Sequence, residues 1–83
     1  MANWQNRLTL KILYTNNRDH ASIQASMTEI ADQLDAAPFF RGFSTTRFRT
    51  IPAGDDVISP VDYANKLLDK MYDFADAHGI WID

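Results

Sequence analysis

Cysteine is absent from this chain, and its 83 residues include only three glycines and three prolines. Without cysteine the protein has no disulfide bond, no thiol nucleophile and no cysteine-bound zinc or iron–sulfur site. The glycines are scattered, which excludes a glycine-rich loop of the kind that binds phosphates. A domain this small that lacks covalent or metal cross-links depends for its stability on side-chain packing or on a partner subunit.

Long apolar runs are missing as well. The sequence contains no stretch of about 18 apolar residues, the minimum for a transmembrane helix. Its opening residues, M-A-N-W-Q-N-R, do not have the pattern of a charged and then apolar leader. We therefore expect a soluble, cytoplasmic protein that does not associate with membranes. An apolar content of 46% is sufficient for one core, so we expect residues 1–83 to form a single domain.

Candidate catalytic and metal-binding side chains are also scarce. The only two histidines, His20 and His78, are not at a spacing that indicates a shared metal ion. Neither has a serine or aspartate neighbour in a pattern that indicates a catalytic triad. We predict that the protein is not an enzyme and that it uses no cofactor and no metal.

Charge is unevenly distributed along the chain, although the net charge is only −3. Residues 38–54 contain three arginines and no acidic residue, a local charge of +3. Residues 55–83 contain seven aspartates and two lysines, a local charge of −5. Such asymmetry is informative about binding partners, and here it predicts a basic middle segment followed by an acidic end.

The first of two predicted helices begins near residue 19 and runs to about Ala37. Asn17 or Asp19 can cap its start, and Pro38 ends it. Its apolar residues recur at the three- and four-residue spacing of one helix face. They are Ile23, Met27, Ile30, Ala31, Leu34 and Ala37.

The second predicted helix has the clearest start signal in the chain. Ser59 can accept a hydrogen bond from a free backbone N–H group, and Pro60 suits the first helical position. The helix is expected to run to His78, after which Gly79 can adopt a left-handed closing conformation. Its core-facing residues are Ala64, Leu67, Leu68, Met71, Phe74, Ala75 and His78.

Four segments have features of β-strands. Residues 8–14 alternate between apolar and polar, and residues 40–51 have the composition of a strand but a poor alternation. Residues 57–58 can form a short strand, and residues 80–83 a final short strand or a packed tail. The order strand, helix, strand, strand, helix, strand predicts an α+β fold of the ferredoxin-like βαββαβ type. In that two-layer sandwich both helices lie on one face of a small antiparallel sheet.

The segment RGFSTTRF, residues 41–48, resembles in part the octamer with which RNA-recognition motifs stack bases on aromatic side chains. A match at four positions carries this resemblance. The matching residues are Arg41, Gly42, Phe43 and Phe48. In a two-layer fold one sheet face stays open, and bases could stack there while cations contact phosphates.

Three departures weaken this resemblance. Thr45 replaces the central stacking aromatic, and Thr46 replaces the usual aliphatic residue. The octamer also falls on the second predicted strand, whereas the family carries it on the third. Finally, the protein is acidic, and phosphate binding favours a basic protein. Nucleic-acid binding is therefore an alternative. In the other interpretation, the segment is an ordinary sheet strand whose arginines face water or pair with aspartates. The residues of the alternative interface are Lys11, Phe43, Arg47 and Arg49.

Charged residues of the second helix form a continuous ridge, which we call the acidic face. At about 100° per residue its members lie within one sector of the helix, opposite the core-facing residues. They are Asp62, Lys66, Asp69, Asp73 and Asp76. Such a ridge is either a solvated surface that keeps the protein soluble or a docking surface for a basic region of another protein.

These features favour a non-catalytic protein-interaction module. In this hypothesis the chain is a small inhibitor or adaptor, including the kind that phages encode, and it binds a larger protein. The binding residues are the acidic face and edge aromatics such as Trp81. Large aromatics at the edge of a small domain can mark an interface, and the alternative is that they close the ends of the core. A third hypothesis is a homodimer or larger homo-oligomer joined through an exposed sheet edge or open face.

Overall fold

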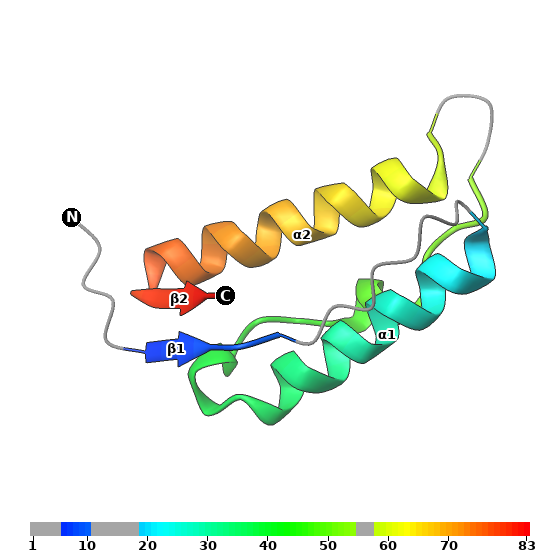
Figure 1. Ribbon diagram of the computed structural model, residues 1–83. Helices are drawn as coiled ribbons and strands as arrows, with labels where there is room; N and C mark the ends of the chain where they lie inside the picture. The colour runs from blue at the N-terminus through cyan, green and yellow to red at the C-terminus, as the bar shows by residue number, and fades with distance from the viewer. Residues whose placement is uncertain (1–5, 11–18, 55–57) are drawn as a thin grey trace.

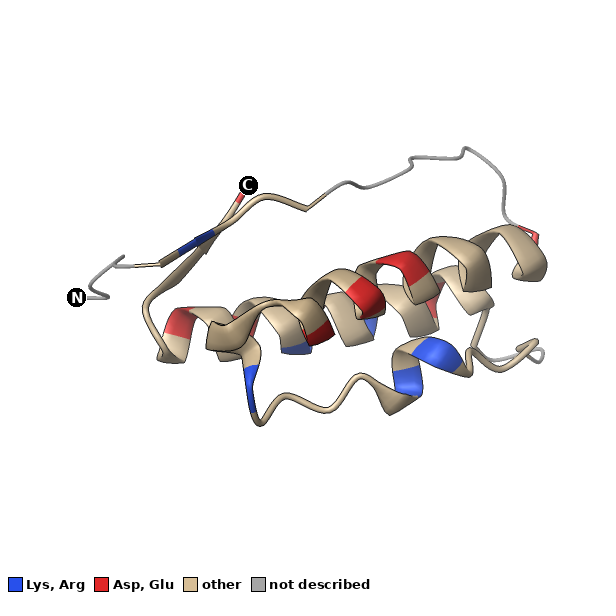
Figure 2. Ribbon diagram, turned by 90° about the horizontal axis from the view of Figure 1, so that it is seen from below, with Lys and Arg blue, Asp and Glu red and all other residues tan. Residues whose placement is uncertain are grey.

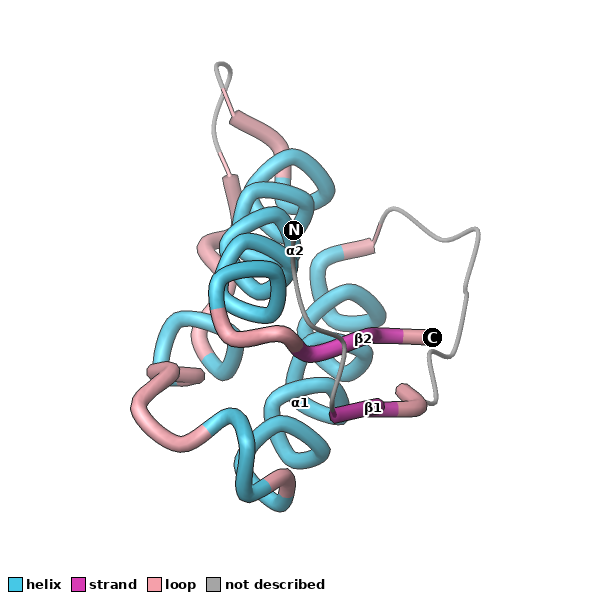
Figure 3. The backbone as a smooth tube through the Cα atoms, turned by 90° about the vertical axis from the view of Figure 1, so that its left-hand side faces the viewer, coloured by secondary structure: helices cyan, strands magenta, loops and turns pink. Residues whose placement is uncertain are grey.

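The computed structural model describes residues 6–10, 19–54 and 58–83. The elements in these ranges, in chain order, are β1 (Asn6–Leu8), α1 (His20–Ala36), η1 (Pro38–Phe40), η2 (Thr46–Arg49), α2 (Pro60–Ala77) and β2 (Ile80–Ile82). Figure 1 shows α1 and α2 packed side by side and running in the same direction, and Figure 3 shows residues 38–54 lying along one side of the helix pair. Within the described ranges, no helix combines the length and the hydropathy that a membrane span requires.

Both helices form where the sequence predicts them, because their start signals are local. The Asp19 carboxylate accepts a hydrogen bond from the Ser22 backbone N–H at 3.3 Å and caps α1. The Ser59 hydroxyl accepts from the Asp62 N–H at 3.2 Å and caps α2. At the end of α2, Gly79 has a φ of +66°, the left-handed conformation predicted for that position.

The sheet differs from the prediction of a ferredoxin-like βαββαβ fold, which is wrong. In the described ranges the only sheet consists of β1 and β2, which pair in parallel rather than antiparallel. Asn6 lies opposite Ile80, Arg7 opposite Trp81 and Leu8 opposite Ile82. Figure 3 shows the two strands adjacent at the end of the molecule where α2 ends.

The outcomes for the individual predicted strands differ. For the last, predicted at residues 80–83 as a short strand or a packed tail, residues 80–82 form the strand β2. For the first, predicted at residues 8–14, the strand lies earlier at residues 6–8, and residues 11–14 lie outside the described ranges. Of residues 57–58, Val57 also lies outside those ranges, and Ile58 is not in a strand.

Residues 40–51 form turns and short 3₁₀ helices instead of a strand. The Gln24 side chain of α1 supplies hydrogen bonds that a neighbouring strand would otherwise provide. Its Nε2 donates to the Phe48 carbonyl at 3.0 Å, and its Oε1 accepts from the Ile51 N–H at 2.6 Å. The buried residues Thr45, Phe48 and Ile51 recur every three positions, which is the period of a 3₁₀ turn and not of a strand. That spacing also explains the poor alternation of the segment.

A cluster of four phenylalanines joins this segment to α2. Phe40 stacks on Phe74 of α2 with ring centroids 5.3 Å apart. Phe43 lies 5.2 Å from Phe74 and meets Phe48 edge to face at 5.8 Å. The segment therefore contributes to the hydrophobic core that the apolar faces of α1 and α2 enclose.

Candidate functional site

All five residues of the acidic face lie in α2, and all five are exposed. The helix is continuous from residue 60 to residue 77, so their spacing aligns them along one side of it. Within the described ranges, none of the three salt bridges involves a residue of this face. The acidic face therefore presents four carboxylates and one ammonium group to water.

The acidic face meets β2 at a small groove, which we call the α2–β2 groove. Its volume is about 250 Å³. The residues that line it are Tyr72, Asp73, Ala75, Asp76, Ile80, Trp81 and Ile82. Ala75 and Ile80 are almost fully buried and form its base, whereas Tyr72 and Trp81 are 47% and 46% exposed. In the described ranges these two are the exposed large hydrophobic side chains, and both belong to this one groove.

Asp83 fixes the position of Trp81. The Trp81 indole Nε1 donates to Asp83 Oδ1 at 2.7 Å, and Arg7 Nε of β1 forms an ion pair with Asp83 Oδ2 at 2.7 Å. The Thr9 hydroxyl lies 3.4 Å from the same carboxylate. The hydrogen bond from Arg7, and next that from Trp81, lower the pKa of Asp83 below its ordinary value. The carboxylate thus connects both strands to the exposed indole.

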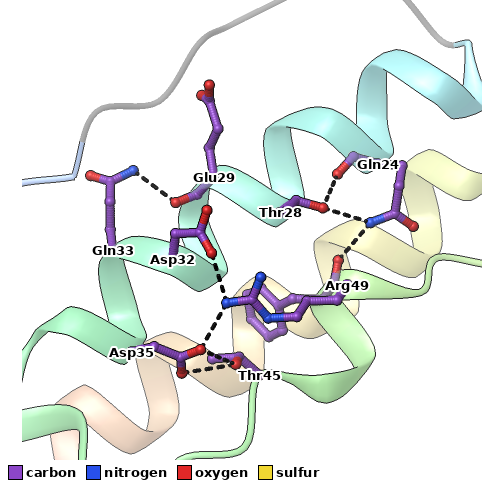
Figure 4. A network of polar contacts seen from close by, with 9 residues as sticks. Gln24, Thr28, Glu29, Asp32, Gln33, Asp35, Thr45 and Arg49 are labelled. Carbon is purple, nitrogen blue, oxygen red and sulfur yellow. Dashed lines mark hydrogen bonds and ion pairs between the residues drawn. The ribbon is translucent and has the colours of Figure 1, made fainter.

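A second polar cluster holds the arginine-rich segment on α1 (Figure 4). Arg49 Nη2 lies 2.8 Å from a carboxylate oxygen of Asp32 and 2.8 Å from one of Asp35. The Thr45 hydroxyl also donates to Asp35, at 2.9 Å. The hydrogen bond from Arg49, followed by that from Thr45, lowers the pKa of Asp35, and Asp35 in turn raises the pKa of Arg49. Figure 2 shows the basic positions of this segment beside acidic positions of the helix.

The described residues of the alternative nucleic-acid interface, Phe43, Arg47 and Arg49, do not form a stacking surface. Phe43 is half-buried and packs against three phenylalanine rings of the core, so it is not displayed on an open sheet. Arg49 is engaged by two aspartates of α1, while Arg47 is exposed. Lys11 lies outside the described residues. The prediction of a strand at residues 40–51, on which this interface depended, is wrong.

Sequence reasoning missed two residues of the groove region. Tyr72 precedes Asp76 by four positions and therefore lies beside it on the helix surface, a spacing that could have identified it. Asp83 follows Trp81 by two positions, and in a strand such residues point to the same side. That spacing could have predicted the contact between the indole and the carboxylate.

Comparison of this chain with protein-family models, with curated proteins and with solved structures found no match.

Proposed function

We propose that this chain is a non-catalytic protein-interaction module, an inhibitor or adaptor that binds a larger protein through the α2–β2 groove and the acidic face of α2. One observation carries the proposal. Tyr72 and Trp81, the exposed large hydrophobic side chains of the described ranges, line the same groove as two carboxylates of that face, Asp73 and Asp76.

Support comes from the composition of known interfaces. Residues that dominate binding energy are enriched in tryptophan and tyrosine, and they are usually placed in or beside a pocket. Charged residues around such a centre mainly determine the association rate and the choice of partner. A binding surface with this arrangement on an acidic helix selects a partner whose complementary surface is basic.

The fixed orientation of Trp81 is a second source of support. Its indole is hydrogen-bonded to Asp83, which is itself paired with Arg7 of the neighbouring strand. A side chain held in place before binding loses less conformational entropy when the complex forms. Exposure together with restraint is typical of an anchor residue at an interface.

The test is affinity capture of partners from a lysate of the source organism, with identification by mass spectrometry. We expect one dominant partner for the unchanged protein and loss of that partner for Asp73→Lys and for Trp81→Ala. Glu29→Lys is the matched control, because Glu29 is exposed on α1 and the substitution changes the charge by the same amount. The control should retain the partner.

If Asp73→Lys captures the partner as well as the unchanged protein does, the acidic face does not bind the partner and only keeps the protein soluble. Sedimentation at micromolar concentration tests the third hypothesis, a homo-oligomer. We expect a monomer. If the protein is a dimer that Trp81→Ala dissociates, the binding partner of the groove is a second copy of this chain and not a larger protein.

A further inference from the structure

We propose that the α2–β2 groove receives an arginine side chain of the partner, with the guanidinium group against the aromatic rim and hydrogen-bonded to Asp73 or Asp76. This inference rests on the proposed function, because it names the chemistry by which the same surface recognises its partner. Four properties of the groove carry it: its size, its base, its rim and its charge.

The size of the groove suits one side chain. Pockets for small molecules and cofactors have volumes of about 300–1,000 Å³. The α2–β2 groove, at about 250 Å³, is smaller than that range and lies at the surface. Single anchor side chains that enter shallow pockets of this kind contribute much of the binding energy of protein interfaces.

The base and the rim of the groove differ in chemistry. Ala75 and Ile80 give the base an apolar surface, which suits the aliphatic stem of a long basic side chain. The rim presents two aromatic rings, from Tyr72 and Trp81, and the carboxylate of Asp76. A cation is favoured by the faces of the rings and by the carboxylate, whereas an apolar group would remove the carboxylate from water without compensation.

The helix spacing brings an aromatic ring and carboxylates to the same place. Tyr72 and Asp76 are four residues apart in α2, and Tyr72 and Asp69 are three apart, so both carboxylates neighbour the phenol ring on the helix surface. A cation next to Tyr72 therefore lies within reach of negative charge on either side. Within the described ranges no salt bridge neutralises these carboxylates.

Arginine fits this arrangement better than lysine does. Its planar guanidinium group can stack on an aromatic ring while its N–H groups donate to a carboxylate in the plane of the group. The lysine ammonium group is compact and strongly hydrated, and it cannot stack in this way. The excess of carboxylates over the two lysines of α2 provides the charge complementarity for a positively charged partner segment.

Titration with short capped peptides, followed by NMR of the labelled protein, tests the proposal. The probe is Gly-Arg-Gly-Arg-Gly, and two matched peptides carry lysine or the uncharged arginine isostere citrulline. We expect the citrulline peptide to bind about tenfold or more weakly than the arginine peptide, and the lysine peptide to bind with intermediate affinity. Equal affinity for arginine and citrulline, or for arginine and lysine, would overturn the proposal.

Matched variants separate recognition in the groove from general attraction to an acidic protein. Asp76→Asn changes a groove residue, and Glu29→Gln removes one carboxylate from the exposed side of α1, outside both the groove and the acidic face. The two substitutions change the net charge by the same amount, so both reduce the nonspecific attraction of a cationic peptide to a similar extent. We expect Asp76→Asn and Trp81→Leu to weaken binding of the arginine peptide about fivefold or more, and Glu29→Gln to leave it within about twofold.

Equal weakening by Glu29→Gln and Asp76→Asn would overturn the proposal in favour of nonspecific electrostatics. Circular dichroism of each variant establishes that the helices are retained. Failure of the proposed function and failure of arginine recognition give different results. If Asp73→Lys loses the captured partner while the arginine and citrulline peptides bind equally, the proposed function stands and arginine recognition is wrong.

Discussion

Gln24 is a single side chain that determines how a whole segment folds. Both ends of its amide are used, one on the Phe48 carbonyl and the other on the Ile51 N–H, while Nε2 also reaches the Thr28 hydroxyl at 3.1 Å. Unpaired backbone groups in a partly buried position would cost free energy, so this side chain stabilises the segment without a strand partner. A glutamine on a helix is usually solvent-exposed, and nothing in its sequence context identifies this role.

We predict that Gln24→Ala lowers the free energy of unfolding by about 1–3 kcal/mol, because it leaves two backbone groups without their partners. Gln33→Ala is the matched control, since Gln33 donates to Glu29 of its own helix at 3.2 Å and the same atoms are removed. Urea denaturation measures both. Equal effects of the two substitutions would mean that Gln24 does not hold the segment.

Asp35 gives the protein a pH-dependent contribution to stability. Its pKa is lowered in the folded state, first by the hydrogen bond from Arg49 and next by that from Thr45. A carboxyl group whose folded pKa is below its unfolded value of about 3.9 stabilises the fold above that pH. The contribution is lost as the pH falls through the folded pKa.

We therefore predict that Asp35→Asn destabilises the protein at pH 7 and that its effect begins to shrink below about pH 4, vanishing only as the pH falls through the lowered folded pKa, where the unchanged side chain also becomes neutral. The measurement is urea denaturation of both proteins across this pH range. The effect is modest, because the Asp35 side chain is half exposed and solvent weakens its ion pair. A constant difference between the two proteins at all pH values would contradict the assignment.

At the scale of elements, the two helices could be predicted because their signals are local. Ser59 and Asp19 accept hydrogen bonds from residues three positions ahead, and each helix has apolar residues at a helical spacing. The segment 40–51 could not be predicted in the same way. Its conformation depends on Gln24 and Asp35, which are brought to it by the packing of α1. Strand composition is outweighed here by tertiary contacts.

Gly54, which lies close to the residues that begin α2, provides a prediction at this scale. Gly54 and Gly42 have φ values of +91° and +95°, a conformation that strains any other residue. A Cβ atom at Gly54 would lie 2.8 Å from the Ile58 carbonyl oxygen and 2.9 Å from Pro60 Cδ, whereas at Gly42 nothing lies within 4 Å. Gly42 thus serves as a control for backbone strain alone.

We predict that Gly42→Ala costs about 1–2 kcal/mol from strain and that Gly54→Ala costs at least about 1 kcal/mol more, because its methyl group meets backbone atoms. Denaturation in urea, with the same slope for each variant, measures the difference. If the two substitutions cost the same, the close approach of Gly54 to the start of α2 does not constrain the residue at this position.

At the scale of the whole molecule, the pairing of β1 with β2 is what local patterns could not reveal. It joins residues 6–8 to residues 80–82, and a single sequence contains no signal for the register between segments so far apart. The consequence for the candidate site is direct. Pairing at Arg7 and Trp81 brings the arginine to Asp83, which orients the indole beside α2.

The fold changes which of the charged segments remain available to a partner. The basic segment 38–54 is partly neutralised, because Arg49 folds onto Asp32 and Asp35 of α1. The carboxylates of the acidic face lie on the exposed side of α2. The asymmetry predicted from the sequence therefore favours a basic partner on α2 over a nucleic acid on the arginine segment, whose predicted stacking residue Phe43 is packed in the core.

Hydrogen–deuterium exchange of the protein, alone and in complex with the captured partner, tests the assignment of the α2–β2 groove as the binding surface most directly. We predict slower exchange on binding for residues 72–82, which include the end of α2 and all of β2. Residues 41–49, which carry the exposed Arg47, should exchange equally in both states. Protection confined to residues 41–49 or to α1, with residues 72–82 unchanged, would contradict the assignment.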